Sequence, residues 1–132
     1  MILVDTSALI QFLRGANSES SKKLGVVLQR KIPFGINSVI FQEVLQGAGS
    51  EKEYFTLKKY LETQRFYHLR DPIGSFAEAA KIYLDCRKKG ITIRSTIDCL
   101  IAQTAIENGL FLLHEDSDFD LMGKIIPLKF FN

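Results

Sequence analysis

The chain has 132 residues, of which 46% are hydrophobic and 24% charged, and its formal net charge is +2 at pH 7. This globular composition suits one domain with a single core over residues 1–132, and the length is too short for two. No apolar stretch approaches the roughly 18–20 residues that a membrane-spanning helix needs. The apolar start lacks a basic leader and contains Asp5, so we interpret it as part of a cytoplasmic fold rather than as an export signal.

Short apolar strands are predicted to alternate with helices along the whole chain. The expected strands are residues 2–5, 33–37, 66–69 and 110–113, with residues 124–130 as an edge strand because Pro127 cannot donate to a ladder. The expected helices are residues 6–15, 18–31, 38–47, 52–64, 71–90 and 95–109. Asp71 is expected to cap the helix over residues 71–90, with Pro72 at its first position. This order favours an α/β fold whose mostly parallel sheet is covered by helices on both faces.

The two cysteines, Cys86 and Cys99, fall in segments that we expect to be helical. Neither His68 nor His114 stands at a ligand-like spacing from either cysteine. A metal site built from them is therefore disfavoured, and we expect reduced thiols that pack in the core.

Basic residues are concentrated between Lys58 and Arg94. This segment carries nine Lys and Arg residues against four acidic ones. Such a flank could hold a phosphate backbone, or it could simply be the solvated face of helices. The sequence leaves both interpretations open.

Residues 112–121, LLHEDSDFDL, place four carboxylates after an apolar run, namely Glu115, Asp116, Asp118 and Asp120. So much negative charge calls for a compensating partner, which could be solvent, basic side chains or a metal ion. A calcium loop of the EF-hand type is excluded. Counted from Asp116, its sixth and twelfth positions would be Gly and Glu, but here they are Leu121 and Pro127.

Three of the acids are expected at the carboxyl ends of strands, where open parallel sheets bind their ligands. Asp5 ends the first expected strand, and Asp116 and Asp118 follow the fourth. Asp5 could alternatively serve only as the cap of the next helix. A phospho-acceptor role is disfavoured, because Ser7 stands where the common phosphatase motif has a second Asp.

Two further acids fall on expected helices. Glu43 shares a helix face with Ile40 and Val44, where an unpaired charge is costly, although it could instead reach solvent or a lysine. Asp98 opens an apolar helical stripe, but the sequence STID also matches a capping box with Ser95 as the cap. Taken singly, neither residue establishes a site.

Together, Asp5, Glu43, Asp98 and Asp116 are predicted to meet at one rim of the sheet. Carboxylate oxygens of this kind suit Mg²⁺ or Mn²⁺, with water completing the coordination. One or two such ions can activate a bound water and stabilise a phosphodiester during in-line attack, so that no Ser, Cys or His nucleophile is needed. Clustering should raise the pKa of at least one of these acids in the metal-free state.

Four segments carry a resemblance to a known family: ILVDTSALI, INSVIFQEVLQG, STIDCLIAQTA and LLHEDSDFD. In this order, and over nearly the whole chain, they resemble the PIN-domain nucleases, and specifically the VapC toxins of bacterial and archaeal toxin–antitoxin pairs. The resemblance implies a three-layer α/β/α fold with about five strands. It also implies Mg²⁺-dependent cleavage of RNA, in which Mn²⁺ can substitute.

The resemblance assigns the catalytic, metal-binding quartet to Asp5, Glu43, Asp98 and Asp116. It makes Asp118 a further ligand or a nearby supporting acid, and Thr6 the family's hydroxyl beside the first Asp. Asp120 is expected to be a solvated acid at a helix start. His114 stands where the family often has Thr or Ser; we expect it to face solvent, the alternative being that it orients a carboxylate.

The resulting hypothesis is a metal-dependent endoribonuclease whose basic flank holds the neighbouring phosphates. The resemblance implies a protein antitoxin as partner, contact with DNA only through that antitoxin, and a homodimer. Apolar residues such as Phe55 and Tyr60 could serve either protein contact. Two other functions remain open from the sequence. One is an RNA-processing or structure-specific DNA nuclease with the same acids, and the other is a non-catalytic binding module.

Overall fold

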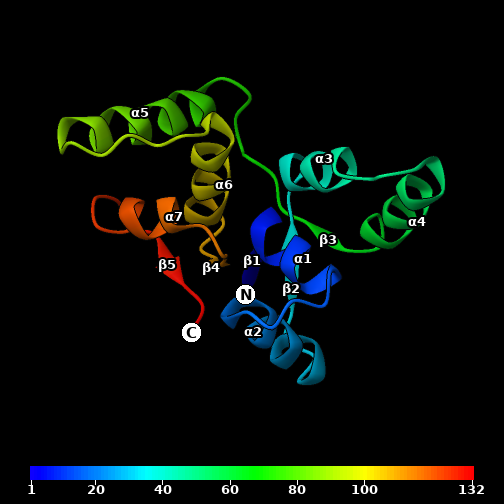
Figure 1. Cartoon of the computed structure of the whole chain (residues 1–132). Helices are drawn as coiled ribbons and strands as arrows, with labels where there is room; N and C mark the ends of the chain where they lie inside the picture. The colour runs from blue at the N-terminus through cyan, green and yellow to red at the C-terminus, as the bar shows by residue number, and fades with distance from the viewer.

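The computed structural model describes all 132 residues as a five-stranded, all-parallel sheet with seven helices (Figure 1). In chain order, the strands are β1 (Ile2–Val4), β2 (Phe34–Ile36), β3 (Arg65–Phe66), β4 (Phe111–Leu113) and β5 (Lys129–Phe130). Their spatial order in the sheet is β3-β2-β1-β4-β5. The helices are α1 (Thr6–Leu13), α2 (Glu19–Gln29), α3 (Ser38–Gln46), α4 (Glu51–Leu61), α5 (Gly74–Lys88), α6 (Thr96–Glu107) and α7 (Ser117–Met122). The predicted parallel α/β architecture is confirmed. None of the helices combines the length and apolarity needed to cross a bilayer.

The central strand β1 sets the register of the sheet. Leu3 lies opposite Gly35 of β2 on one side and opposite Leu112 of β4 on the other. The ladder between β1 and β4 continues past the strand ends, since the Asp5 N–H donates to the carbonyl of Leu113 at 2.9 Å. The chain segments that leave β1 and β4 therefore emerge side by side.

Three helices begin within four residues of the end of a strand, and each is capped by the side chain of the residue just before it. Asp5 caps α1 after β1, Asn37 caps α3 after β2, and Asp116 caps α7 after β4. A side-chain oxygen at this position satisfies one of the N–H groups that a helix start leaves without a partner. The caps thus fix where each chain segment turns at the carboxyl edge of the sheet.

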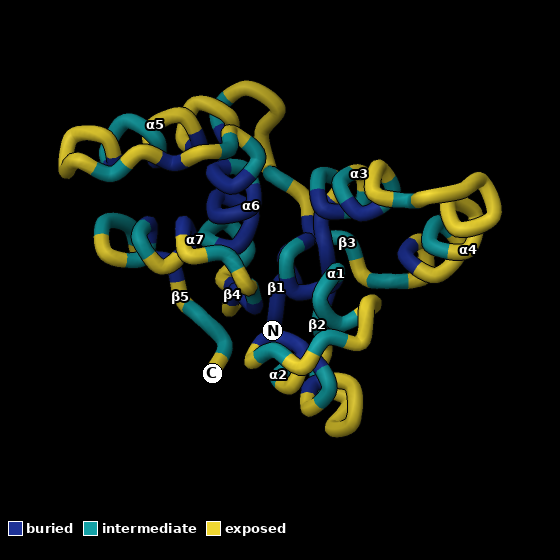
Figure 2. Tube along the Cα trace, in the orientation of Figure 1, coloured by how far each residue is buried: buried dark blue, intermediate teal, exposed yellow.

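One hydrophobic cluster of 26 buried residues fills the core. Helix α6 is buried along most of its length, whereas the outer faces of α4 and α5 are exposed (Figure 2). Cys86 and Cys99 are free and buried in this core, as the sequence predicted.

The start of α5 differs from the prediction. The helix begins at Gly74 with Ile73 at the N-cap position, so Pro72 is not its first residue. Asp71 Oδ1 accepts hydrogen bonds from the N–H groups of Ile73 and Gly74 at 2.8 and 3.0 Å, which forms a turn ahead of the helix. The acid caps this turn, and the turn displaces the helix start by about one half-turn.

The two edge strands are shorter than predicted. β3 comprises Arg65 and Phe66 rather than residues 66–69, and β5 comprises Lys129 and Phe130 rather than residues 124–130. Residues 123–126 instead continue the turns that end α7, where Ile126 N–H donates to the Met122 carbonyl. As predicted, the segment after Pro127 lies at an edge of the sheet.

Candidate active site

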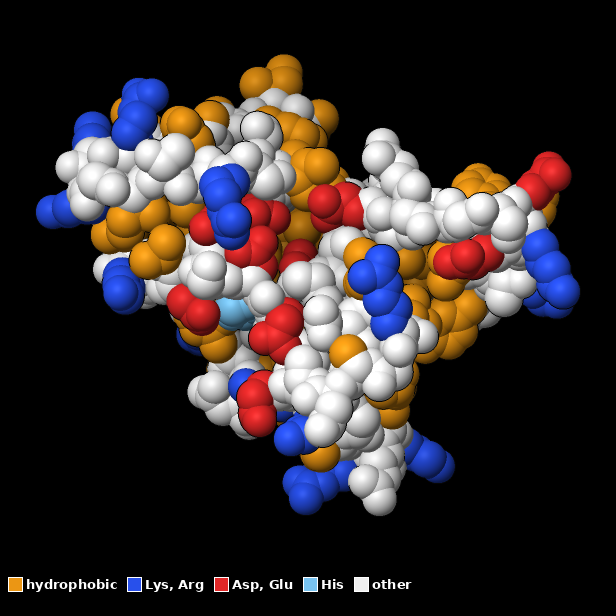
Figure 3. All heavy atoms as spheres, viewed as in Figure 1, with side chains coloured by type: hydrophobic (Ala, Val, Ile, Leu, Met, Phe, Trp, Pro, Cys, Tyr) orange, Lys and Arg blue, Asp and Glu red, His pale blue; other side chains and the backbone are white.

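Acidic side chains gather in the hollow between α6 and α3, at the carboxyl edge of the sheet (Figure 3). Asp5 and Asp116 arrive there as the caps of α1 and α7, Glu43 from the middle of α3, and Asp98 from the first turn of α6. The fold therefore brings all four predicted acids to one edge of the sheet. We call these four acids and the neighbouring Asp118 the acidic rim.

Asp5 is the most deeply buried of the four, with 3% of its surface exposed. Its Oδ2 accepts hydrogen bonds from the Ser7 backbone N–H at 3.0 Å and the Ser7 hydroxyl at 2.5 Å. Its Oδ1 is buried and has no hydrogen-bond partner. Burial raises the pKa of Asp5, and repulsion from Glu43 adds to this, against the Ser7 hydrogen bonds. A buried carboxylate oxygen without a partner is costly, so this atom calls for a cation or a proton.

Glu43 is oriented by Thr6. The Thr6 hydroxyl donates to Glu43 Oε1 at 2.6 Å, which joins the first turn of α1 to α3. The hydroxyl that the family resemblance placed beside the first Asp thus contacts the second acid of the quartet. Charge-assisted hydrogen bonds of this kind are short and directional.

Asp98, among the acids of the rim, has a strongly raised pKa. Ser95 caps α6 by accepting from the Ile97 N–H at 3.2 Å, so the cap itself is satisfied by the serine. Burial raises the pKa of Asp98 to about 7, and repulsion from its acidic neighbours contributes, in the order Asp5, Asp116, Glu43 and Asp118. Four carboxylates that act on a fifth show that these side chains share one electrostatic environment.

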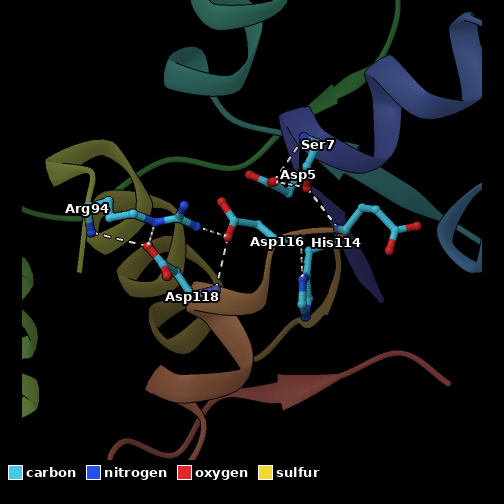
Figure 4. Close-up of polar contacts among 7 residues, drawn as sticks. Asp5, Ser7, Arg94, His114, Asp116 and Asp118 are labelled. Carbon is cyan, nitrogen blue, oxygen red and sulfur yellow. Dashed lines mark hydrogen bonds and ion pairs between the residues drawn. The ribbon is translucent and has the colours of Figure 1, made fainter. Parts of the chain in front are cut away.

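Asp116 and Asp118 are paired with Arg94, which reaches across from the residue before the α6 cap (Figure 4). Arg94 Nε lies 3.1 Å from Asp118 Oδ2, and its Nη2 lies 3.3 Å from Asp116 Oδ1. The same Asp116 oxygen accepts from the Asp118 N–H at 2.9 Å, which is the cap of α7. An internal guanidinium therefore supplies part of the compensating charge for the acidic stretch after β4.

His114 does not face solvent, so that expectation was wrong. Only 10% of its side chain is exposed, and its ring lies 5.2 Å from the ring of Phe119 and 5.1 Å from that of Phe130. Its Nδ1 accepts the Asp116 backbone N–H at 3.0 Å, while Nε2 lies 3.2 Å from a carboxylate oxygen of the exposed Asp120. The imidazole thus provides the local acceptor that a Thr or Ser hydroxyl would provide.

Glu115 turns away from the rim. Its Oε1 accepts from the Ser20 hydroxyl at 2.9 Å, and this bond is the first cause of its lowered pKa. Its backbone N–H donates to the Ser7 hydroxyl at 2.9 Å. Ser7 thus links Asp5 to the segment after β4.

Comparison with known proteins places the chain in a family. The family model described as the PIN domain matches residues 2–125. The chain belongs to the PIN-domain family.

The similar proteins in this family include VapC proteins and VapBC complexes. The chain is 34% identical over 130 residues to the VapC ribonuclease Mb1587 of Mycobacterium bovis and to the ribonuclease VapC11 of Mycobacterium tuberculosis, covering 98% of this chain and 96% of each relative. Among solved structures, VapBC2 from Rickettsia felis, bound to a promoter DNA fragment, matches with a TM-score of 0.74 at 17% identity. VapBC-1 from nontypeable Haemophilus influenzae matches with 0.73 at 19%, and both cover 100% of this chain and 98% of the other. The VapC resemblance drawn from the four sequence segments is confirmed.

The acids of this PIN domain suit a divalent cation in kind, although not in their present side-chain positions. Every candidate donor is a carboxylate oxygen, which Mg²⁺ and Mn²⁺ prefer, and Asp5 Oδ1 is a buried oxygen with no partner. No group of three or more Asp, Glu, His or Cys side chains could hold one ion as the side chains now stand. Asp116 Oδ1 is instead occupied by Arg94 and the Asp118 N–H. Ion binding to the quartet would therefore require its side chains to reorient.

Sequence reasoning missed two residues of this PIN domain's site. The sequence pattern placed Arg94 only in the basic segment between Lys58 and Arg94. Ser7 served only to argue against a phosphatase motif, which has a second Asp at that position. A partial signal for Ser7 was present, because an Asp at a helix N-cap accepts the backbone N–H two or three positions later, and Ser7 stands two positions after Asp5. Arg94 had no local signal, since it meets Asp116 and Asp118 from 22 and 24 positions away.

Proposed function

We propose that this PIN domain is a metal-dependent endoribonuclease and the toxin of a toxin–antitoxin pair. The relatives that share 34% of its residues are named VapC ribonucleases, and the match covers nearly their whole length. The observation that carries the proposal is the acidic rim itself. The buried, unpartnered oxygen of Asp5 stands beside Asp98, whose pKa is raised to about 7 by burial and by repulsion from the neighbouring acids.

The side chains of the rim have separate tasks in such a reaction. Bound to Asp5, Glu43, Asp98 and Asp116, Mg²⁺ or Mn²⁺ would supply Lewis acidity and lower the pKa of an attacking water. Ser7 fixes Asp5 by two hydrogen bonds, and Thr6 fixes Glu43. Preorganised carboxylates of this kind avoid the cost of reorienting charge during the reaction.

The proposed partners are an RNA substrate and a protein antitoxin, with DNA reached only through the antitoxin. The VapBC structures that share this fold are complexes, and one of them holds a promoter DNA fragment. On this chain, the apolar side chains of Phe55 and Tyr60 are exposed on α4, where a homodimer or the antitoxin could cover them.

Cleavage of labelled total RNA by the purified protein tests the proposal. We expect products with Mg²⁺ or Mn²⁺, none with EDTA, and at least a hundredfold lower rate for Asp5→Asn and Asp98→Asn. Asp85→Asn is the matched control, because this acid pairs with Lys81 on the surface of α5. Undiminished cleavage by Asp98→Asn would refute the assignment of the site.

Two further outcomes separate the alternatives. Cleavage of structured DNA in preference to RNA would favour a DNA nuclease with the same acids. Calorimetry that detects no Mn²⁺ binding up to millimolar concentration, together with no cleavage, would favour a non-catalytic binding module. Binding of Mn²⁺ that disappears in Asp98→Asn but persists in Asp85→Asn would support the proposed cation site.

A further inference from the structure

Arg94 is the only basic side chain that forms an ion pair with the acids of the rim. It is held on both sides: its backbone N–H and its Nε both donate to Asp118 Oδ2, at 3.2 and 3.1 Å, and its Nη2 donates to Asp116 Oδ1. Its orientation is therefore set by three hydrogen bonds, although it lies in a segment outside any helix or strand.

The guanidinium of Arg94 is held in place, but not all of its N–H donors have a hydrogen-bond partner. Arginine has five side-chain N–H donors in a rigid fork, and only two of them are used in the contacts with Asp118 and Asp116. The side chain is 71% exposed, so the other donors remain open to solvent beside the acidic rim. These open donors are therefore free to bind an anion that approaches the rim.

Asp118 holds Arg94 in place by accepting two of its hydrogen bonds. Only 6% of its side chain is exposed, and its Oδ2 accepts both the backbone and the Nε hydrogen bonds of Arg94. A buried carboxylate with such partners is costly to release, because the remaining charge would be left unpaired. This pairing disfavours the role of metal ligand that the family resemblance left open for Asp118.

We propose that Arg94 is a phosphate-binding residue of the active site and that Asp118 positions it. The inference rests on the proposed function, because the ligand is the phosphodiester backbone of RNA. An acidic rim repels RNA, and a fixed guanidinium at its border offers the planar, paired donors that match a phosphate. The open N–H groups of Arg94 would thus hold the backbone next to the carboxylates.

Salt-dependent binding of a single-stranded RNA oligonucleotide in EDTA tests this contact, because no cleavage occurs there. Each phosphate contact contributes about 0.7 to the slope of log K against log salt concentration for single strands. We expect Arg94→Ala to bind about tenfold more weakly and to lose about 0.7 of the slope, whereas Arg94→Lys keeps most of the slope. The matched control is Arg30→Ala, an exposed charge that α2 separates from the rim by roughly 15 Å.

The Asp118→Asn variant separates positioning from simple charge. Removal of a negative charge alone predicts tighter RNA binding, whereas loss of the anchor of Arg94 predicts binding no tighter than that of the wild type. An unchanged slope in Arg94→Ala would overturn the phosphate contact. Tighter binding by Asp118→Asn than by the wild type would overturn the positioning role.

Cleavage assays with Mn²⁺ keep this inference distinct from the proposed function. We expect Arg94→Ala to raise KM more than it lowers kcat, since a ground-state phosphate contact acts on binding. If the wild type cleaves no RNA while Arg94→Ala still loses slope, the proposed function fails and the RNA contact stands. If the wild type cleaves RNA and Arg94→Ala matches it in both KM and slope, the contact fails and the function stands.

Discussion

Thr6 and Glu43 are joined by a hydrogen bond of 2.6 Å, although 37 positions separate them in the sequence. Thr6 is buried at the start of α1, directly after Asp5, and Glu43 lies in the middle of α3. The bond therefore aligns Glu43, which comes from a helix, with Asp5, which follows the central strand. It makes the orientation of Glu43 depend on one hydroxyl.

Thr6→Val should lower cleavage without unfolding the protein. Valine keeps the shape of threonine but removes the donor, so Glu43 loses its fixed orientation. We expect kcat/KM to fall about tenfold, which corresponds to roughly 1.4 kcal/mol of transition-state stabilisation. Thr6→Ser keeps the hydroxyl and should retain most of the activity. Full activity of Thr6→Val together with a loss in Thr6→Ser would show that the methyl group, and not the hydroxyl, matters.

Metal-free protein should lose stability as the pH rises from about 4 to 7. The pKa of Asp98 is about 7 in the folded chain, against about 4 when unfolded, so the folded chain binds this proton more tightly. Folding then takes up a proton within this window, and the free energy of unfolding falls as the pH rises. The raised pKa of Asp5 acts in the same direction.

Asp98→Asn removes the part of this pH dependence that comes from Asp98, so comparing the variant with the wild type measures that part. In EDTA the variant should match the wild type near pH 4 and exceed its free energy of unfolding by about 1–2 kcal/mol at pH 8. Urea titrations at the two pH values check this. Addition of Mg²⁺ should raise the stability of the wild type but not of the variant. A gap between the proteins that stays constant with pH would contradict the assignment.

The sequence was sufficient for the parts of the fold that depend on local pattern. Alternating apolar strands and helices gave the parallel sheet, and the acids after the first and fourth strands were placed at its carboxyl edge. The start of α5 was misplaced because Asp71 caps a turn that precedes the helix. The roles of Arg94 and His114 depend on which side chains meet after folding, and no spacing along the chain encodes these contacts.

Gly35 is a second case that local pattern could not reveal. A Cβ atom at this position of β2 would lie 2.5 Å from the Arg65 carbonyl oxygen and 2.6 Å from the Tyr67 ring. Gly35→Ala should therefore destabilise the protein by about 1–3 kcal/mol, because the neighbouring edge strand must shift. Gly25→Ala in α2 is the control, since nothing lies within 4 Å of its added Cβ. It should be neutral or stabilise by about 0.5–1 kcal/mol, and urea midpoints compare the two.

His114 should prove to act through the backbone of Asp116. Its Nδ1 accepts the Asp116 N–H, and its Nε2 faces Asp120, so two amide variants can separate the contacts. Asparagine can place an acceptor near the position of Nδ1, whereas glutamine reaches toward that of Nε2. We expect His114→Asn to retain cleavage within about threefold of the wild type and His114→Gln to lose about tenfold in kcat.

The apolar variant His114→Leu keeps the packing between Phe119 and Phe130 but leaves the Asp116 N–H without an acceptor. An unsatisfied N–H at this partly buried site costs about 1–3 kcal/mol, which should appear as a lower urea midpoint together with the loss of kcat. Asp120→Asn, which alters only the exposed contact, should leave kcat near that of the wild type. If Asp120→Asn loses as much activity as His114→Gln, the Nε2 contact carries the effect and the backbone role of His114 is wrong.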